Sequence, residues 1–460
     1  MTKRSASKGG ARAGELPARV VVGFVARRAP AGLITLDRSL EAPTPMKGLA
    51  HRRGLSVAAS GRRGSAFRTV ATHRPGTRLL LAGFSPGAVT TKDVRAAGAL
   101  RQDVAMRIAQ IAPLAEAVPP RLYGGTERVV SWLTEELVAQ GHEVTLFASG
   151  DSRTTAHLVP CAPQGLRLSG IRCPIASHLV MLNEVRRRAD QFDILHFHVD
   201  LLQHALFRDL AHKCVTTLHG RLDLPDFHPI YRVFPEMPLV SISDSQRAPM
   251  PPNLNWLATI HHGLPATAYP FHPSGGDYLA YLGRIAPEKR PDRAIEIATR
   301  AGVPLRIAAK VDPVDRAYFE ESIRPLLDHP LVEFIGEIDE HAKRDFLGHA
   351  LALLFPIDWP EPFGLVMIEA MAAGTPVIAW RNGSVPEIIA DGISGVIVAS
   401  IEEAVTGVER VWALSRAAVR ARFEARFTAR RMAQNYLTAY ERLLRAPKRG
   451  QTFADEMAVV

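Results

Sequence analysis

The sequence predicts an α/β protein in which two doubly wound, Rossmann-like domains follow one another along the chain. Two observations predict this class. Short apolar runs alternate with helical patterns from Met106 onward, and the alternation breaks near residue 264 and resumes at residue 278. Strands separated by helices favour a parallel sheet, because each helix carries the chain back to the same end of the sheet.

The first domain is expected over residues 106–263. The apolar run MRIAQIAP predicts a buried strand, and YGGTERVVSWLTEELVAQGHEVTLFASG continues it as a loop, an amphipathic helix that Gly141 ends, and a second strand. The later elements expected here are a helix at 175–189, the strand DILHF, a helix near 201–212, and the strands CVTTLHG and PLVSIS.

A linker is expected at residues 264–277, which are rich in proline, glycine and small side chains. The second domain follows at 278–430. Its expected elements are the strand YLAYLGRI, the helix RPDRAIEIATRAG, and the strands PLRIAAK, VEFIGE, ALALLFP, PVIAW and SGVIVAS. The helical region at 402–445 is expected to pack across both domains, with 431–460 as a crossing helix and tail. Ligands of open α/β sheets lie beyond the carboxyl ends of the strands, so a cleft between the domains is the predicted site.

The net charge of +10 is unevenly distributed. Residues 1–105 carry 19 Lys and Arg against 5 Asp and Glu, a net of +14, so the remainder of the chain has a net of −4. The basic segment is rich in Arg, Gly and Ala and shows no sustained periodicity. We interpret it as a disordered extension or a misassigned start. A targeting segment and a nucleic-acid or membrane tether are the alternatives.

Three cysteines without CxxC spacing argue against a disulfide framework or a zinc site and favour a reducing compartment. No apolar run reaches the ~18 residues of a membrane span. We therefore expect a cytoplasmic protein, with a peripheral contact to a membrane surface left open.

The stretch EPFGLVMIEAMAAGTP, residues 361–376, predicts a helix with a single charge, Glu369, in its middle. Pro362 suits the first helical position and Gly374 the position after the last. An unpaired buried carboxylate is costly, so Glu369 should either reach water or hold a group that donates hydrogen bonds. A vicinal diol such as ribose is one such group, and a buried Arg partner is the structural alternative.

Three further motifs lie at strand ends. Gly124 and Gly125 form a turn that lets a backbone approach an anion at the next helix, although such a turn often has no ligand. Arg284 and Lys289, in GRIAPEKRP, offer two cations suited to a diphosphate, against the alternative of a solvated basic loop. His219 ends the strand CVTTLHG, where a structural role is the more common one.

The pattern EPFGLVMIEAMAAGTPVIA, with Glu361 and Glu369 in an E-x7-E element, resembles the retaining nucleotide-sugar glycosyltransferases of family four, which have the GT-B fold. GRIAPEKRP, YGGTERVV, SVPEIIADGISGVIV and VSISDSQR are similar to segments of that family. The resemblance covers residues 106–445, and residues 1–105 have no counterpart in it.

The resemblance implies roles for ten residues. Glu369 would bind the donor's ribose, and Glu361 the transferred sugar, beside the backbone of the segment Phe363, Gly364 and Leu365. Arg284 and Lys289 would hold the diphosphate, which Gly124 and Gly125 approach from the other domain. His219 would lie near the transferred sugar. The family's mechanism implies retention without an enzyme nucleophile. Cations and helix-end amides would stabilise the charge on the leaving diphosphate.

No DxD motif is present, so we expect no metal and no cofactor beyond the nucleotide sugar as co-substrate. The acceptor, a carbohydrate, a lipid or a small molecule, is expected on the first domain, where the Pro-rich, apolar segment PLAEAVPPRLYGG would shape its pocket. UDP, GDP and ADP sugars stay open as donors. The rival readings are a nucleotide-sugar epimerase, which lacks a carboxylate cluster for C2, and a nucleic-acid or membrane binding protein acting through residues 1–105. The charge distribution disfavours a nucleic-acid partner.

Overall fold

The computed structural model describes residues 26–28, 34–36, 105–121, 124–167, 169–171 and 173–446. The chain divides into two compact units, 1–103 and 104–460. In the first unit β1 (Ala26–Arg28) pairs antiparallel with β2 (Ile34–Leu36). The predictions for the rest of the basic segment and for the tail after residue 446 lie outside the described residues.

The N-terminal sheet of the second unit is parallel throughout, in the order β5-β4-β3-β6-β7-β8-β9 among the described residues. Its strands are β3 (Arg107–Ile111), β4 (Glu143–Ser149), β5 (His157–Ala162), β6 (Ile194–Phe197), β7 (Cys214–Thr217), β8 (Leu239–Ser241) and β9 (Trp256–Thr259). Its helices are α2 (Gly125–Ala139), α3 (Pro174–Arg187), α4 (His228–Val233) and α5 (Asp244–Arg247). The first strand lies in the middle, so the strand order reverses between β3 and β6.

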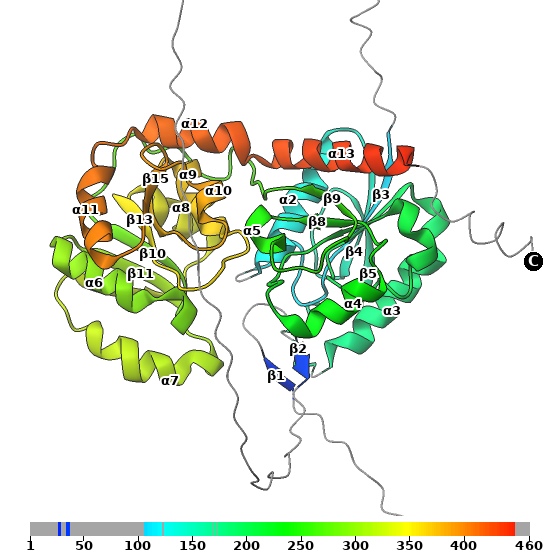
Figure 1. The fold of residues 1–460 in the computed structure, drawn as a ribbon, viewed down its shortest axis with the longest axis horizontal. Coiled ribbons are helices and arrows are strands. Elements are labelled where there is room, and N and C mark those ends of the chain that lie inside the picture. The colour runs from blue at the N-terminus through cyan, green and yellow to red at the C-terminus, as the bar shows by residue number, and fades with distance from the viewer. Residues whose placement is uncertain are drawn as a thin grey trace, which may run out of the picture. The chain divides into compact units, whose positions relative to one another are not determined.

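The C-terminal sheet repeats this plan in the order β12-β11-β10-β13-β14-β15 and is also parallel (Figure 1). Its strands are β10 (Leu279–Arg284), β11 (Leu305–Lys310), β12 (Val332–Gly336), β13 (Ala352–Phe355), β14 (Val377–Trp380) and β15 (Gly395–Val398). Its helices are α6 (Pro291–Ala301), α7 (Arg316–Tyr318), α8 (Glu340–Gly348), α9 (Leu365–Ala373), α10 (Val385–Ile388), α11 (Ile401–Val411) and α12 (Arg416–Arg426). The predicted pair of doubly wound domains is confirmed.

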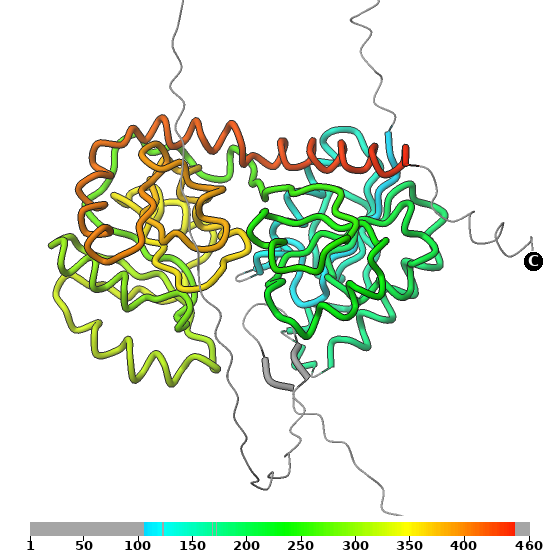
Figure 2. The backbone as a smooth tube through the Cα atoms, viewed as in Figure 1, coloured from blue at the N-terminus to red at the C-terminus, as the bar shows by residue number. Residues whose placement is uncertain are grey.

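The last helix, α13 (Ala429–Arg445), returns from the C-terminal domain to the N-terminal one, as Figure 2 shows in red. Its apolar face, which includes Met432, Tyr436, Tyr440 and Leu443, packs in one cluster with side chains of β3 and α2. Burying these large side chains ties the end of the chain to the first domain, at about 25 cal/mol for each Å² of apolar surface removed from water. The predicted crossing helix is thereby confirmed.

The helical region expected at 402–445 is three helices, α11, α12 and α13. The breaks come where Ser415 and Thr428 take extended backbone conformations and their hydroxyls accept the amides of Ala418 and Arg431. Side-chain caps of this kind start new helices, so the apolar face can be redirected at each break.

The prediction of a helix near 201–212 is wrong. Residues 200–207 form turns, and 208–213 form a 3₁₀ segment. Asp200 has a positive φ of 55°, and the Gln203 amide donates to the Asp200 carbonyl and to the Thr216 hydroxyl. These bonds give the backbone an alternative to helical pairing and hold the segment against β7.

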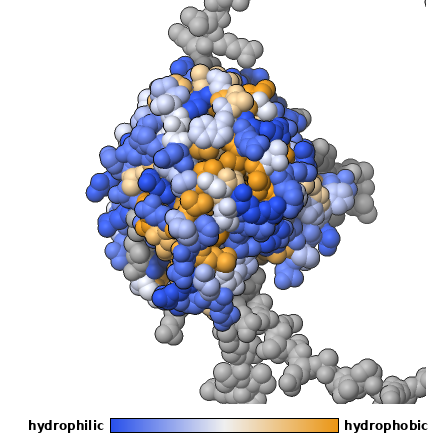
Figure 3. All heavy atoms as spheres, turned by 90° about the vertical axis from the view of Figure 1, so that its left-hand side faces the viewer, coloured by the Kyte–Doolittle hydropathy of each residue, from blue (hydrophilic) through white to orange (hydrophobic). Residues whose placement is uncertain are grey.

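The surface in Figure 3, the side that lies on the left in Figure 1, is mainly hydrophilic with hydrophobic atoms gathered near its middle. No helix of the described residues is long and apolar enough to cross a membrane.

Candidate active site

The site predicted from the sequence divides into a C-terminal half and an N-terminal half. Each half lies where the strand order of its sheet reverses, which is where open α/β sheets place ligands. The C-terminal half comes from β10 and the loop between β13 and α9. The N-terminal half comes from the loop between β3 and α2 and from the ends of β6 and β7.

Glu369 is buried in α9, with 4% of its surface exposed, and is paired. Lys343 on α8 places its Nζ 2.7 Å from Glu369 Oε1 and 2.9 Å from Glu340 Oε2. Sequence reasoning did not predict α8 and so missed Lys343. A carboxylate has room for further hydrogen-bond donors beyond one ammonium group, so the pairing leaves Glu369 able to accept from a ligand.

A pocket adjoins this pair at the carboxyl ends of β10, β11 and β12. Arg128 of α2 reaches it from the N-terminal domain and forms a 3.0 Å ion pair with Glu340. The pocket is lined by Arg128, Leu282, Gly283, Ala308, Ala309, Lys310, Glu337, Ile338, Asp339, Glu340, Lys343, Val366 and Glu369. Its wall is therefore apolar along the strands and charged along α8 and α9.

The start of α9 differs from the prediction, because the helix begins at Leu365 and not at Pro362. The carbonyls of Glu361, Pro362 and Phe363 each accept a hydrogen bond from elsewhere: from the Ser384 amide at 3.0 Å, and from the hydroxyls of Ser243 and Ser384 at 2.7 Å. These bonds satisfy the carbonyls without helical amides. Gly364 completes the turn with a positive φ of 78°. Residues 361–364, which we name the donor loop after the role expected for Glu361, therefore form irregular chain before the helix.

Glu361 of the donor loop forms an ion pair with Lys289. The Nζ of Lys289 also lies 4.6 Å from the ring centroid of Trp359. The sequence placed Glu361 and Lys289 in one site, and the structure brings them into contact. Both side chains are largely buried, at 13% and 21% exposed, so a ligand anion that replaced Glu361 at this lysine would meet a charge with little competing water.

Arg284 ends β10 and faces carboxylates. Its guanidinium lies 2.6 Å from Glu288, 3.6 Å from Asp312 and 3.6 Å from Asp315. Burial raises the pKa of Asp315, and the opposing charge of Arg284 partly offsets that rise. Arg284 is thus held in place by acids on two loops, whereas Lys289 forms its ion pair with Glu361 of the donor loop.

The Gly124–Gly125 turn meets the start of α9. Gly124 has a φ of 154°, and a Cβ there would lie 2.8 Å from Pro120 Cβ. Gly125 opens α2, and a Cβ on it would lie 3.5 Å from Leu365 Cδ1. The first residues of α2 and α9 are therefore neighbours across the two domains. The starts of two helices are favourable environments for an anion, because first-turn amides lack partners within the helix.

Glu127 follows in the first turn of α2 and is almost fully buried. Burial raises its pKa to about 7, opposed by hydrogen bonds from the backbone of Glu127 itself and of Glu116. The bond from Glu116 ties α2 to the loop at 113–121, which the sequence assigned to the acceptor. That assignment stays a prediction.

His219 lies in a cluster of buried imidazoles that sequence reasoning did not find. Its Nε2 is 2.8 Å from His198 Nδ1, and its ring stacks on His262 at 5.2 Å between centroids. His262 contacts Phe363 of the donor loop at 4.8 Å. The structure therefore brings His219 close to the donor loop. A signal was present in the sequence, since HFH and HH place His196, His198, His261 and His262 at strand ends.

The imidazoles of this cluster are uncharged near neutral pH. Burial lowers the pKa of His219 to about 3. Burial also lowers the pKa values of His196, His198 and His262 well below their usual range, helped by the neighbouring imidazoles. The buried Nδ1 of His219 has no hydrogen-bond partner among the described residues, which leaves this atom for a ligand hydroxyl.

The cluster is anchored on α13. His196 lies 2.7 Å from the Tyr440 hydroxyl through Nδ1 and 2.7 Å from the Thr217 hydroxyl through Nε2. Thr217 in turn lies 2.9 Å from the Tyr436 hydroxyl. Within the described residues, no group of three or more His, Cys, Asp or Glu side chains could hold a metal ion. The predicted independence of metal stays a prediction.

Two family models match the chain, one for each domain. Residues 270–426 match glycosyl transferases group 1, and residues 123–238 match Glycosyltransferase Family 4. Together with two parallel α/β domains and a cleft-facing polar site, these matches support a glycosyltransferase of the GT-B class. More particularly, its C-terminal domain is similar to the group 1 glycosyl transferases and its N-terminal domain to Glycosyltransferase Family 4.

Curated relatives include an uncharacterized glycosyltransferase of Methanocaldococcus jannaschii, 24% identical over 63% of this chain and 85% of the relative. The glycogen synthase of Mycobacterium tuberculosis is 27% identical over 60% of this chain and 79% of the relative.

Among solved structures, sucrose-phosphate synthase from Thermosynechococcus elongatus matches with a TM-score of 0.60 at 18% identity, over 74% of this chain and all of the other. HepE of Anabaena, in complex with UDP and glucose, matches with a TM-score of 0.57 at 16% identity, over 73% of this chain and all of the other. These likenesses show the GT-B fold.

Proposed function

We propose that this protein transfers a sugar from a nucleotide diphosphate sugar to an acceptor hydroxyl with retention of configuration, as the family-four enzymes that it resembles do. The observation that carries the proposal is the arrangement around α9. A buried carboxylate, Glu369, lines a pocket at the strand ends, and an ammonium group, Lys289, pairs with Glu361 of the donor loop, near where two helices begin.

In the proposed complex the ribose hydroxyls donate to Glu369, which Lys343 holds in position. The diphosphate lies at the starts of α2 and α9, beside Gly124, Gly125 and Leu365. The diphosphate replaces Glu361 as the ion-pair partner of Lys289. Glu361 then accepts a hydrogen bond from a hydroxyl of the transferred sugar. This exchange replaces one ion pair by another, so the ammonium group stays compensated at every stage.

The same cations act on the reaction. As the bond to the anomeric carbon breaks, the leaving diphosphate gains charge, and Lys289, Arg284 and the helix amides stabilise that charge without reorganising. The acceptor hydroxyl attacks from the face that the diphosphate leaves, and its proton passes to the diphosphate oxygen. The uncharged His219 accepts or donates a hydrogen bond at the sugar. We propose no metal for this step, because protein groups supply the positive charge.

The donor is proposed to be a nucleotide diphosphate sugar, as the complexes of HepE of Anabaena with UDP and of a starch synthase of Arabidopsis thaliana with ADP suggest. UDP, GDP and ADP sugars are all candidates. The acceptor is proposed to bind the N-terminal domain and to be a carbohydrate, a lipid or a small molecule. The cytoplasmic location and the peripheral membrane contact stay predictions.

The test is a thermal-shift series on the full chain with UDP, GDP, ADP and their sugar conjugates, with and without EDTA. A ligand at about 100 times its Kd stabilises the native state by roughly 2.7 kcal/mol. We expect one nucleotide to raise the Tm selectively and EDTA to leave the shift unchanged. A folded protein whose Tm responds to none of these ligands would refute the proposal. NMR of the product's anomeric proton then tests retention.

A further inference from the structure

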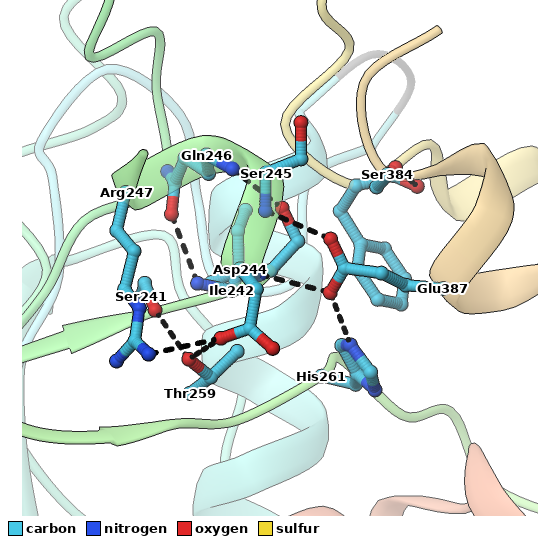
Figure 4. Close-up of polar contacts among 12 residues, drawn as sticks. Ser241, Ile242, Asp244, Ser245, Gln246, Arg247, Thr259, His261, Ser384 and Glu387 are labelled. Carbon is cyan, nitrogen blue, oxygen red and sulfur yellow. Dashed lines mark hydrogen bonds and ion pairs between the residues drawn. The ribbon is translucent and has the colours of Figure 1, made fainter. Parts of the chain in front are cut away.

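A carboxylate of the C-terminal domain is bound by the N-terminal domain, as Figure 4 shows. Glu387 lies on α10 and accepts the backbone amides of Asp244 and Ser245, each at 2.8 Å. It also lies 3.1 Å from His261 Nε2, which belongs to the chain between β9 and the second domain. One side chain thus contacts both domains and the segment that joins them.

The amides that Glu387 binds open α5, and α5 holds the backbone around His219. Gln246 of α5 is buried, and its Nε2 donates to the carbonyls of Leu218 and Gly220 at 2.8 Å each. These carbonyls flank His219 on both sides. A displacement of α5 would therefore move His219 and its contacts to His198 and His262.

The same contact region holds the donor loop. Ser243, which precedes α5, accepts the amide of Gln246 and donates from its hydroxyl to the Pro362 carbonyl at 2.7 Å. Ser384, which precedes α10, donates to the Phe363 carbonyl at 2.7 Å. The loop that carries Glu361 is thus bound from both domains, on one side through α5 and on the other through α10.

Glu387 is an ionised acceptor at neutral pH. Burial by itself raises the pKa of Glu387, but the hydrogen bond with His261 and those from the amides of Ser245 and Asp244 outweigh it and lower the pKa. Asp244 is occupied by Thr259 and Arg247, and Arg426 donates to the backbone carbonyl of Glu387.

We propose that Glu387 is a positioning residue that sets His219 of the N-terminal domain against the donor loop of the C-terminal domain. This inference rests on the proposed sugar transfer for its catalytic consequence and on the contacts above for its structural one. Glu387 acts through α5 on His219 and through α10 on the donor loop, so it determines whether the two halves of the site are in register. An error of about 1 Å in such a register can cost 100-fold in rate.

The test compares Glu387→Gln with a matched control, Ser415→Ala. Glutamine has the shape of glutamate but only one side-chain oxygen. Its NH₂ group would face a backbone amide of α5 or His261, so part of the hydrogen bonding of Glu387 is lost. Ser415 also caps a helix, α12, which lies in the C-terminal domain outside the proposed site. Hydrogen–deuterium exchange of the full chain is followed by mass spectrometry. The kcat and KM of donor hydrolysis are measured with UDP-glucose, GDP-mannose and ADP-glucose.

For Glu387→Gln we expect faster exchange in three segments, 242–247, 216–222 and 361–367, and unchanged exchange in β10. We also expect a fall in kcat of about 10- to 100-fold with a donor KM within about twofold of wild type. Ser415→Ala should change exchange in α12 alone and leave kcat unaltered. Glu387→Asp keeps the charge on a shorter side chain, so its kcat and its exchange rates should lie between those of wild type and Glu387→Gln. It replaces the glutamine variant if that variant does not fold.

Faster exchange limited to 242–247 would overturn the inference, because Glu387 would then be a cap of α5 and nothing more. An unchanged kcat in a variant with altered exchange would overturn the catalytic part. A wild-type protein that hydrolyses no donor and binds no nucleotide would refute the proposed function instead. The hydrogen–deuterium exchange data would still decide whether Glu387 links α5 to the segment around His219 and to the donor loop.

Discussion

The two halves of the site differ in the charge of their polar side chains. At the strand ends of the N-terminal domain, the side chains around His219 are mainly buried, uncharged imidazoles and hydroxyls that are bonded to one another, and the carboxyl group of Asp200 accepts the backbone amide of His219. At the strand ends of the C-terminal domain, they are ion pairs, Lys289 with Glu361 and Lys343 with Glu369. The first half offers neutral hydrogen-bonding groups, and the second offers compensated charge.

The difference teaches how one cleft can bind two unlike groups. A diphosphate, the group proposed to bind here, needs fixed cations, and these are held at the strand ends of the C-terminal domain by carboxylates that a ligand can replace. A sugar hydroxyl near a developing positive centre needs a partner that adds no positive charge, and buried imidazoles with lowered pKa values meet that need. The four predictions below test this contrast, beginning with the largest expected effect.

Lys289→Ala should lower kcat by about 10²- to 10³-fold, because it removes a preformed cation from the leaving diphosphate. The measurement is donor hydrolysis or transfer at saturating donor. Lys213→Ala serves as the control, since Lys213 donates to backbone carbonyls of Ala189 and Phe192 in the N-terminal domain. A kcat equal to that of wild type would remove Lys289 from the mechanism.

Glu369→Gln should weaken binding of the nucleotide by about 10- to 100-fold, because hydrogen bonds to a charged acceptor contribute roughly 1.5–3 kcal/mol. Glu333→Gln is the matched control, as Glu333 forms an exposed ion pair with Arg306 on β11. Calorimetric titration measures both. If the affinity of Glu369→Gln matches that of the control, the ribose-binding role is wrong.

The N-terminal half should make the protein sensitive to mild acid. The pKa of His219 is about 3 in the folded state and about 6.5 when unfolded, so between these values the unfolded chain binds a proton that the folded chain does not. Its contribution is therefore complete above pH 6.5 and falls by about 1.4 kcal/mol per pH unit as pH decreases.

His219→Gln should reduce the slope of the unfolding free energy against pH by about 1.4 kcal/mol per pH unit between pH 6.5 and pH 3. Urea unfolding at pH 7.5, 6.0 and 5.0 measures it. Asp200, whose pKa burial raises to about 6, acts in the opposite direction and is present in both proteins. Equal slopes for the two proteins would show that His219 is not a buried neutral base.

The smallest effect is expected for Tyr440→Phe, which removes the hydroxyl that contacts His196 and keeps the buried ring. The loss in unfolding free energy should be about 1 kcal/mol. Urea unfolding at pH 7.5 measures the loss. A change above about 3 kcal/mol would mean that α13 supports the histidine cluster through more than this bond.

Much of the fold could be predicted because its signals are local. The alternation of apolar runs with helical patterns located β3, β4, β6, β7, β8 and β10 through β15, and Gly374 ends α9 as expected. The signals failed where long-range bonds override local preference. Pro362 does not start a helix because Ser243 and Ser384 bind the neighbouring carbonyls, and the segment after Asp200 forms turns because Gln203 binds Thr216.

The site shows the same division. The sequence by itself determined which residues lie at strand ends, since those positions follow from periodicity, and it singled out Glu361, Glu369 and Lys289. Only the tertiary structure decided their partners: Lys343 for Glu369, the imidazoles around His219, and the contact of Glu387 with α5. Those partners are far apart in the chain, and they meet because β3 lies beside β6, β10 beside β13, and α13 returns to the first domain.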